Sequence, residues 1–222
     1  MARRSVQMSL PLTSGWGGKR VGAGRPRLAP RALVPHRPRP VHQASYPEHL
    51  TWRCVAGLGS LRGAEVFPAI AAALSAHRAA GAAFRVVHFS VQDDHLHLIV
   101  EAQDARALRL GAQGLGVRLA RAINRALGRR GRVFDDRYHA RALRTPREVR
   151  IALAYVLHNF KKHQKLAATR LDPCSSALWF DGFREVRGAP LAARAAVHAP
   201  RTWLVRVGWR RHGLVSVRER PA

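Results

Sequence analysis

The sequence predicts an α+β fold in which short strands and long helices alternate. Three observations predict it: segments with alternating apolar residues, segments with apolar residues at helical spacing, and turn or capping residues between these segments. A chain of 222 residues that is 47% hydrophobic is long and apolar enough to form a core. We therefore expect one domain, with tails at its ends.

The first half of this domain is predicted to contain a strand, a helix and two further strands. Residues 49–56 alternate between apolar and polar side chains, which is typical of a half-buried strand. Residues 64–80 place apolar side chains at helical spacing. Residues 83–91 and 95–101 are apolar segments joined by a short polar turn, so we expect two antiparallel strands.

The second half is predicted to add a long helix and a fourth strand. Asp104 can cap a helix that runs to about Leu127, and residues 133–143 have an extended pattern. The six elements then run strand, helix, strand, strand, helix, strand. This is the order of a ferredoxin-like βαββαβ sandwich, in which two helices cover one face of the sheet.

A seventh element begins with clear capping chemistry. Thr145 can accept a hydrogen bond from the backbone N–H of Glu148, and the Glu148 side chain can reach back to Thr145. Pro146 suits the first turn, because its missing N–H would have no helical partner there. We expect this additional C-terminal helix to run to about Gln164 and to lie on the open face of the sheet.

Composition divides the chain into three parts. Residues 1–46 lack acidic residues and are rich in Arg, Pro and Gly, which predicts a flexible basic arm. The arm could add phosphate contacts or be a solvated tail without a role. Residues 47–166 form the predicted domain. The extension, residues 167–222, is expected to pack partly on that domain, with a strand over residues 203–209.

The charge favours a polyanionic partner. Lys and Arg number 39 against 13 Asp and Glu, which gives a formal net charge of +26, and only four of the basic residues are lysines. Such a surplus is typical of proteins that bind nucleic acid or an anionic membrane. Coding bias can produce an Ala- and Arg-rich composition too, and basic ribosome-associated proteins look similar.

Several classes of protein are disfavoured. Cys54 and Cys174 are too few for a disulfide framework or a cysteine zinc cluster. No apolar run approaches the roughly 20 residues that span a bilayer, and Pro11 and Gly15 interrupt the start of the chain, which argues against a signal peptide. No Walker-type phosphate loop is present, so no nucleotide cofactor is expected. We expect a reduced, soluble, cytoplasmic protein without a membrane partner.

A histidine pair is the first candidate site. His95 and His97 lie two apart on a predicted strand, so both point to one face, roughly 6.5–7 Å apart, and the intervening leucines point to the other. Two imidazoles at this separation can bind one divalent ion. The alternative is a surface-facing pair that arose by chance among 12 histidines. HIT-type nucleotide hydrolases need a third alternating histidine. Ile99 stands at that position, which counts against this family.

The capped helix carries the second candidate site. Tyr155 and Asn159 lie one turn apart on a flank of its apolar stripe, and Lys162 continues the row. A helix packed on the sheet could turn this flank toward the histidines, where the Asn159 amide would complete a metal site. A phenol beside a metal and a phosphate is a plausible nucleophile. The alternative is a tyrosine that packs its ring and solvates its hydroxyl.

Together these motifs resemble a known family. The segment His95-Leu-His97 is followed by Arg118-Leu-Ala-Arg-Ala-Ile-Asn124, Arg137-Tyr-His-Ala-Arg141 and Tyr155-Val-Leu-His-Asn159. In this order and at these distances, they resemble the single-tyrosine HUH transposases, which include insertion-sequence transposases and REP-associated tyrosine transposases. The resemblance covers about residues 47–165. Two positions depart from the common pattern, since Phe160 stands where Pro is frequent and Asp94 where Asn is frequent.

The resemblance implies a chemistry. It implies that His95 and His97 bind Mg²⁺ or Mn²⁺, that Asn159 is the third, amide-bearing ligand, and that Tyr155 is the nucleophile. The expected activity is cleavage and rejoining of single-stranded, hairpin-forming DNA through a 5′-phosphotyrosine, as in DNA transposition. Relatives act as monomers or dimers, so the resemblance allows a homodimer but does not require one.

Basic residues on two predicted helices and the turns that follow them are candidates for phosphate contacts. They are Arg118, Arg121, Arg125, Arg129, Arg130, Arg132, Lys161, Lys162 and Lys165. Each alone could be a solvated surface charge. Two other functions stay open: a domesticated, non-mobile DNA- or RNA-binding protein with this fold and little cleavage, and a basic ribosome-binding protein in which the histidine pair is incidental.

Overall fold

The computed structural model describes residues 40–79, 81, 83–163, 171–186 and 196–220. All of them belong to the unit that spans Val34–Ala222. Most of the predicted basic arm therefore lies outside the described residues, and so does Lys165.

Four strands form one antiparallel sheet in the order β2-β3-β1-β4. Their bounds are β1 Glu48–Arg53, β2 Phe84–Val91, β3 His95–Ala102 and β4 His139–Ala142. The antiparallel pairing of the second and third predicted strands is confirmed. Only four residues of the predicted extended segment 133–143 belong to a strand. With its antiparallel sheet and separate helices, the protein has the α+β class that the sequence predicts.

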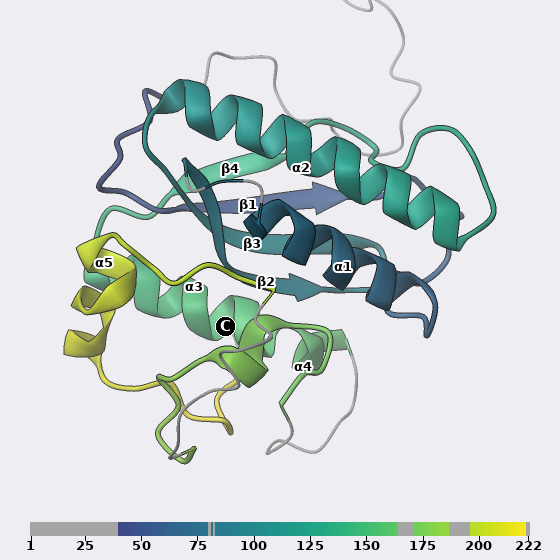
Figure 1. Cartoon of the computed structure of the whole chain (residues 1–222). Coiled ribbons are helices and arrows are strands. Elements are labelled where there is room, and N and C mark those ends of the chain that lie inside the picture. Colours follow the sequence, from purple (N-terminus) through teal and green to yellow (C-terminus); the bar gives the residue numbers. More distant parts are fainter. Residues whose placement is uncertain (1–39, 80, 82, 164–170, 187–195, 221–222) are drawn as a thin grey trace, which may run out of the picture. The chain divides into compact units, whose positions relative to one another are not determined.

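Two helices cover one face of this sheet (Figure 1). They are α1 (Val66–Ala79), which follows β1, and α2 (Ala105–Ala126), which follows β3. Asp104 caps α2 as predicted, because its carboxylate accepts a 2.7 Å hydrogen bond from the backbone N–H of Ala107. Leu96 and Leu98 of β3 point toward these helices and are fully buried. The strand alternation therefore leaves the neighbouring histidines on the opposite face.

The helix α3 (Pro146–His158) packs on that opposite face, against Val87 and Ile99 (Figure 1). The predicted capping box is present between Thr145 and Glu148. The predicted continuous helix to Gln164 is not observed. Instead α3 ends with Asn159 as its C-cap, and the short helix α4 (Phe160–His163) follows.

The predicted strand over residues 203–209 is wrong. The segment forms the short helix α5 (Trp203–Arg206) and most of the 3₁₀ turn η3 (Gly208–His212). Thr202 caps α5 by accepting a hydrogen bond from the Val205 N–H. Leu204 and Val205 are both buried although they are neighbours, whereas a half-buried strand would alternate them between two faces.

Other described residues of the C-terminal extension pack on β2 and α3. The 3₁₀ turn η1 (Ser176–Trp179) bonds to β2 through Ser176, whose hydroxyl accepts from the Phe89 N–H at 3.0 Å. Phe180, Phe183 and Trp209 join α3 in a second hydrophobic cluster. These aromatic side chains cover the side of α3 that the sheet leaves exposed.

Two buried carboxylates, Asp172 and Glu101, link the C-terminal extension to the sheet layer. Arg62 donates two hydrogen bonds to Asp172, of 2.7 and 3.0 Å. Glu101 of β3 accepts from Arg85 at 2.5 Å and from the Thr202 hydroxyl at 2.6 Å. Each carboxylate is 1% exposed or less. The bonds from Arg62 to Asp172 and from Thr202 to Glu101 connect segments that are far apart in the sequence.

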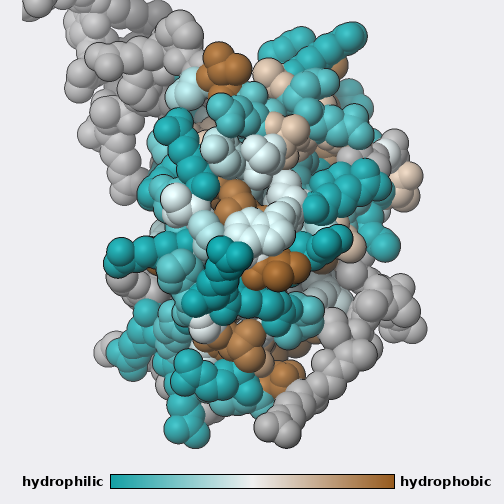
Figure 2. Space-filling view, turned by 90° about the vertical axis from the view of Figure 1, so that its left-hand side faces the viewer, coloured by the Kyte–Doolittle hydropathy of each residue, from teal (hydrophilic) through white to brown (hydrophobic). Residues whose placement is uncertain are grey.

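Contacts with the sheet begin before residue 47, where the predicted domain starts. One ring nitrogen of His42 lies 2.7 Å from a carboxylate oxygen of Glu48, and the other lies 3.1 Å from the carbonyl oxygen of Ala102. Cys54 and Cys174 are free and buried. In the described ranges, no helix combines the length and apolar character needed to cross a membrane. On the face drawn in Figure 2, hydrophilic residues predominate and hydrophobic ones form small separate groups.

Candidate active site

The histidine pair lies on β3, on the sheet face that α3 covers. His95 is 7% exposed and His97 is 4% exposed. Their ring centroids are 4.8 Å apart and the rings are nearly perpendicular. Both imidazoles are therefore buried side by side rather than displayed on an open surface.

Tyr155 meets this pair from α3. Its ring centroid lies 5.0 Å from that of His97, with the two rings at 79° to each other. The position follows from the helix pattern, since Leu153 and Val156 are fully buried and Tyr155 is half-buried at the edge of the contact. Burial raises the pKa of the Tyr155 phenol, and the positive charge of Arg53 opposes this shift. The phenol therefore keeps its proton at neutral pH.

A third histidine joins the site, which the sequence analysis did not single out. The Nε2 atom of His49, on β1, lies 3.1 Å from Nδ1 of His97, and its ring centroid lies 5.8 Å from that of Tyr155. Burial, together with the charges of His139 and Arg141, lowers the pKa of His49 to about 4. His49 is therefore neutral near pH 7.

The surroundings of His97 orient its ring. Besides His49, the Thr51 hydroxyl lies 3.1 Å from the same Nδ1 atom. A proton on Nδ1 of His97 would be donated to one of these neighbours, and Nε2 would then be the nitrogen that binds a cation. Such hydrogen bonds commonly fix the orientation of metal-binding histidines.

His95 has a carboxylate in the corresponding place. Its Nδ1 atom lies 2.6 Å from one oxygen of Asp94, and the other Asp94 oxygen accepts a 2.8 Å hydrogen bond from Arg53. Burial acts to raise the pKa of Asp94, but the hydrogen bond and charge of His95, together with Arg53, outweigh it and lower this pKa. An ionised Asp94 would accept a hydrogen bond from the Nδ1–H group of His95, which again directs Nε2 toward a ligand.

Asn159 supplies a polar group suited to a cation. It lies one helical turn after Tyr155 and is fully buried. Within the described ranges, neither its side-chain oxygen nor its nitrogen has a hydrogen-bond partner. Buried polar atoms normally have a partner, so this amide oxygen is available to a cation. The same ranges contain no group of three or more His, Cys, Asp or Glu side chains that could hold a metal.

Three of the predicted phosphate-binding residues lie away from this site. Arg118, Arg121 and Arg125 are on α2, which covers the other face of the sheet. In the turn after α2, Arg129 donates to the carbonyl oxygen of Arg132 at 3.2 Å. Arg132 in turn donates to the carbonyl oxygen of Phe134 at 2.7 Å, and Arg130 is exposed.

The predicted lysine cluster is not a free basic surface at Lys161. Its ammonium group donates to the carbonyl oxygen of Val217 and, at 3.2 Å, to that of Glu219. This contact ties α4 to the C-terminal segment, and we do not assign Lys161 to phosphate binding. Lys162 belongs to the same short helix.

Comparison with known proteins identifies one related fold. No protein-family model matches the chain, and no curated protein matches it. Among solved structures, the chain is similar to a REP-associated tyrosine transposase, which was determined bound to a REP hairpin. The TM-score is 0.52 at 15% sequence identity, and the match covers 64% of this chain and 82% of that one. The protein thus shares its fold with a tyrosine transposase.

Proposed function

We propose that this protein is a single-tyrosine transposase, which cleaves and rejoins single-stranded, hairpin-forming DNA through Tyr155. The observation that carries the proposal is the 5.0 Å separation between the ring centroids of Tyr155 and His97. A tyrosine that merely packs its ring needs no buried histidine pair beside it. The order strand, helix, strand, strand, helix, strand with the sheet order β2-β3-β1-β4 supports a ferredoxin-like catalytic domain.

The residues present fit a divalent cation, Mg²⁺ or Mn²⁺. His95, His97 and Asn159 would hold it through two imidazole nitrogens and an amide oxygen. The buried Asn159 amide, without a partner in the described part of the chain, supports this set. When bound, the cation would act as a Lewis acid toward the scissile phosphate.

The Tyr155 phenol would act as the nucleophile. Its oxygen forms a bond to phosphorus while the bond from phosphorus to the 3′ oxygen breaks, which gives a 5′-phosphotyrosine and a free 3′-hydroxyl. The phenol loses its proton as it attacks, and the departing 3′ oxygen gains one. A base or a water molecule beside the phenol would take the proton of Tyr155.

Rejoining would reverse these bonds. A 3′-hydroxyl from another strand attacks the phosphotyrosine, the new phosphodiester forms, and Tyr155 recovers its proton. The energy of the original phosphodiester stays in the covalent link between protein and DNA. The reaction therefore needs no nucleotide cofactor.

The substitution Tyr155→Phe tests the nucleophile. With a hairpin oligonucleotide and Mn²⁺, the native protein should form a covalent adduct that persists on a denaturing gel. The variant should form none, because it lacks the attacking oxygen. Its affinity for the hairpin, measured by fluorescence anisotropy, should be unchanged.

The controls separate the competing functions. An adduct of normal yield with Tyr155→Phe would refute the assignment of the nucleophile. Tight hairpin binding by the native protein without any adduct would instead support the alternative of a domesticated DNA-binding protein. Tyr138 offers a matched control, because Tyr138→Phe removes a phenol that lies on the other side of the sheet and should leave the adduct intact.

A further inference from the structure

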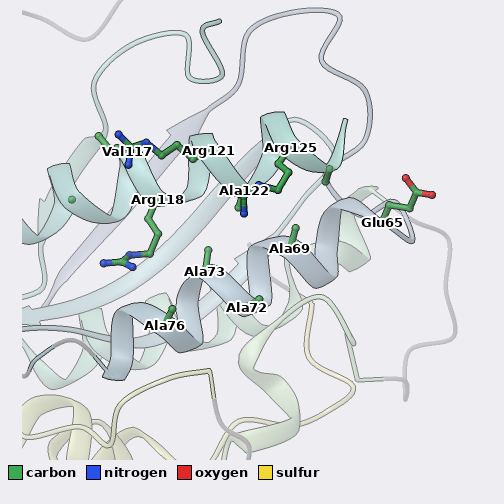
Figure 3. Close-up of a pocket in the computed structure, with 12 residues that line it drawn as sticks. Glu65, Ala69, Ala72, Ala73, Ala76, Val117, Arg118, Arg121, Ala122 and Arg125 are labelled. Atoms are coloured by element: carbon green, nitrogen blue, oxygen red, sulfur yellow. The ribbon is translucent and has the colours of Figure 1, made fainter. Parts of the chain in front are cut away.

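A groove with a volume of about 660 Å³ runs between α1 and α2 (Figure 3). Alanines of α1 line one side, at helical spacing from Ala69 to Ala76. Arg118, Arg121 and Arg125 of α2 line the other side. The proposed reaction does not use this surface, because α1 and α2 cover the sheet face opposite to Tyr155.

The three arginines are available to a ligand. All are exposed, and within the described segments none of them takes part in a hydrogen bond or a salt bridge. By contrast, Arg62 and Arg85 each bind a buried carboxylate. In the described segments, the three arginines of the groove therefore do not hold other parts of the protein together through such bonds.

The spacing of the row matches a nucleic-acid backbone. From Arg118 to Arg125, at a rise of about 1.5 Å per residue, the arginines extend over roughly 10 Å along α2. One strand of duplex DNA presents a phosphate about every 3.4 Å along the helix axis. The row can therefore face about three consecutive phosphates. The alanines opposite are short, so no long side chain keeps a backbone away from the guanidinium groups.

We propose that this groove binds the sugar-phosphate backbone of the double-stranded stem of the DNA hairpin. The inference rests on the proposed function for the kind of DNA, and it adds a second contact on the face away from the reacting strand. The strand that reacts must lie beside Tyr155, with the sheet between it and the groove. The groove thus contributes affinity for the stem and takes no part in the chemistry.

The charges in the groove favour DNA over a protein segment. A protein ligand would need a regular acidic row to match the arginines, whereas every DNA strand carries one. Among the lining residues, only Glu65 is acidic, and Figure 3 shows it at one end of the groove. It would repel a phosphate there and so mark the limit of the bound stem.

A pair of double variants tests the proposal, because α2 carries two arginine pairs of equal spacing. Arg118→Gln with Arg121→Gln removes two charges from the groove. Arg106→Gln with Arg109→Gln removes two exposed charges from the same helix outside the groove. Both are made in the full-length protein with Tyr155→Phe, so that binding is measured without cleavage.

The readout is hairpin affinity as a function of salt concentration, measured by fluorescence anisotropy. The groove variant should lower the slope of log K against log salt by about 2, since each lost phosphate contact lowers it by about 1. At low salt its Kd for the hairpin should rise about tenfold or more. The control pair should change the slope little, and a stemless single strand should bind all proteins alike.

The outcomes are decisive for the groove and separate from the proposed function. Equal slopes for the two double variants would overturn the inference, and so would an equal loss of affinity for the stemless strand. A groove-dependent salt slope, together with no adduct from the protein that retains Tyr155, would refute the nuclease and support the groove as a DNA site. Circular dichroism and thermal unfolding confirm that each variant is folded before binding is compared.

Discussion

The ring of His97 is held by strand register. Thr51 of β1 pairs directly with His97 of β3 in the sheet, and His49 lies diagonally across from it. Both side chains reach the same Nδ1 atom at 3.1 Å. A neighbour that fixes the ring of a metal-binding histidine typically changes metal affinity by 10- to 100-fold when removed. His49 is thus a positioning residue for the proposed cation site.

We expect His49→Ala to weaken Mn²⁺ binding by roughly 10- to 100-fold, because the ring of His97 loses one of its two Nδ1 neighbours. Electron paramagnetic resonance of free Mn²⁺ in a titration measures the affinity without any DNA. His212→Ala is the control, since His212 is an exposed histidine on η3, away from β1 and β3. Equal Mn²⁺ affinity in the native protein and in His49→Ala would show that His49 does not orient the site.

At this scale, local spacing predicted part of the site and could not predict the rest. The i,i+2 spacing of His95 and His97 and the i,i+4 spacing of Tyr155 and Asn159 are visible in the sequence. His49 carries no such signal. It reaches His97 only through the pairing of β1 with β3, and one strand alone does not reveal its register.

At the scale of elements, capping chemistry was the most informative signal. The start of α3 follows from Thr145, Pro146 and Glu148, all adjacent in the sequence. Its end was not predictable, because the surrounding contacts come from a distant segment. His158 donates to the carbonyl oxygen of Ser216 at 2.9 Å. The helix α5 at residues 203–206 was not predictable for a similar reason. Its cap, Thr202, is bonded to Glu101, which lies far away in the sequence.

The link between β3 and α5 leads to a prediction on stability. Glu101→Gln should lower the free energy of unfolding by about 3 kcal/mol at pH 7, because it leaves the buried Arg85 without its counter-charge. Burial acts to raise the pKa of Glu101, but the bonds from Thr202, Arg85 and the backbone lower it below 4.5 overall. The stabilisation is therefore present above pH 4.5 and is lost as the pH falls through the lower native value.

Chemical denaturation at several pH values measures this effect. The difference in unfolding free energy between the native protein and Glu101→Gln should shrink below pH 4.5. Glu65→Gln provides the comparison, since Glu65 is exposed and its substitution should change stability by less than about 0.5 kcal/mol. A difference that stays constant or grows toward acid pH would contradict the role given to Glu101.

At the scale of the whole molecule, the sequence predicted the order of the strands and helices from β1 to β4 and the placement of α1 and α2 on one face of the sheet. Alternation on β3 sends Leu96 to α1 and α2 and sends His97 to α3. The net charge of +26 indicated a polyanion but did not show where it would bind. The arginines of α2 lie on the sheet face that α1 and α2 cover. The histidine pair lies on the opposite face, so the sheet separates the two groups.

A single chain brings His97 and Tyr155 together, which predicts that each monomer reacts alone. Mixing His97→Ala with Tyr155→Phe should therefore not restore the covalent adduct. A reaction that used the tyrosine of a second chain would regain adduct in the mixture, because one chain would supply the histidines and the other the phenol. Native protein diluted over a wide range should give the same adduct rate constant at saturating DNA.

The contacts behind α3 bear on how strands would be exchanged. Arg150 of α3 donates to the carbonyl oxygens of Gly213 and Leu214 and forms a salt bridge with Glu219. The segment 213–219 therefore binds α3 on the side away from the sheet. In the proposed reaction, a helix α3 that is packed on both of its sides would keep Tyr155 beside the histidine pair. The DNA end linked to Tyr155 would then keep its position, and the strand that carries the attacking 3′-hydroxyl would have to move to it.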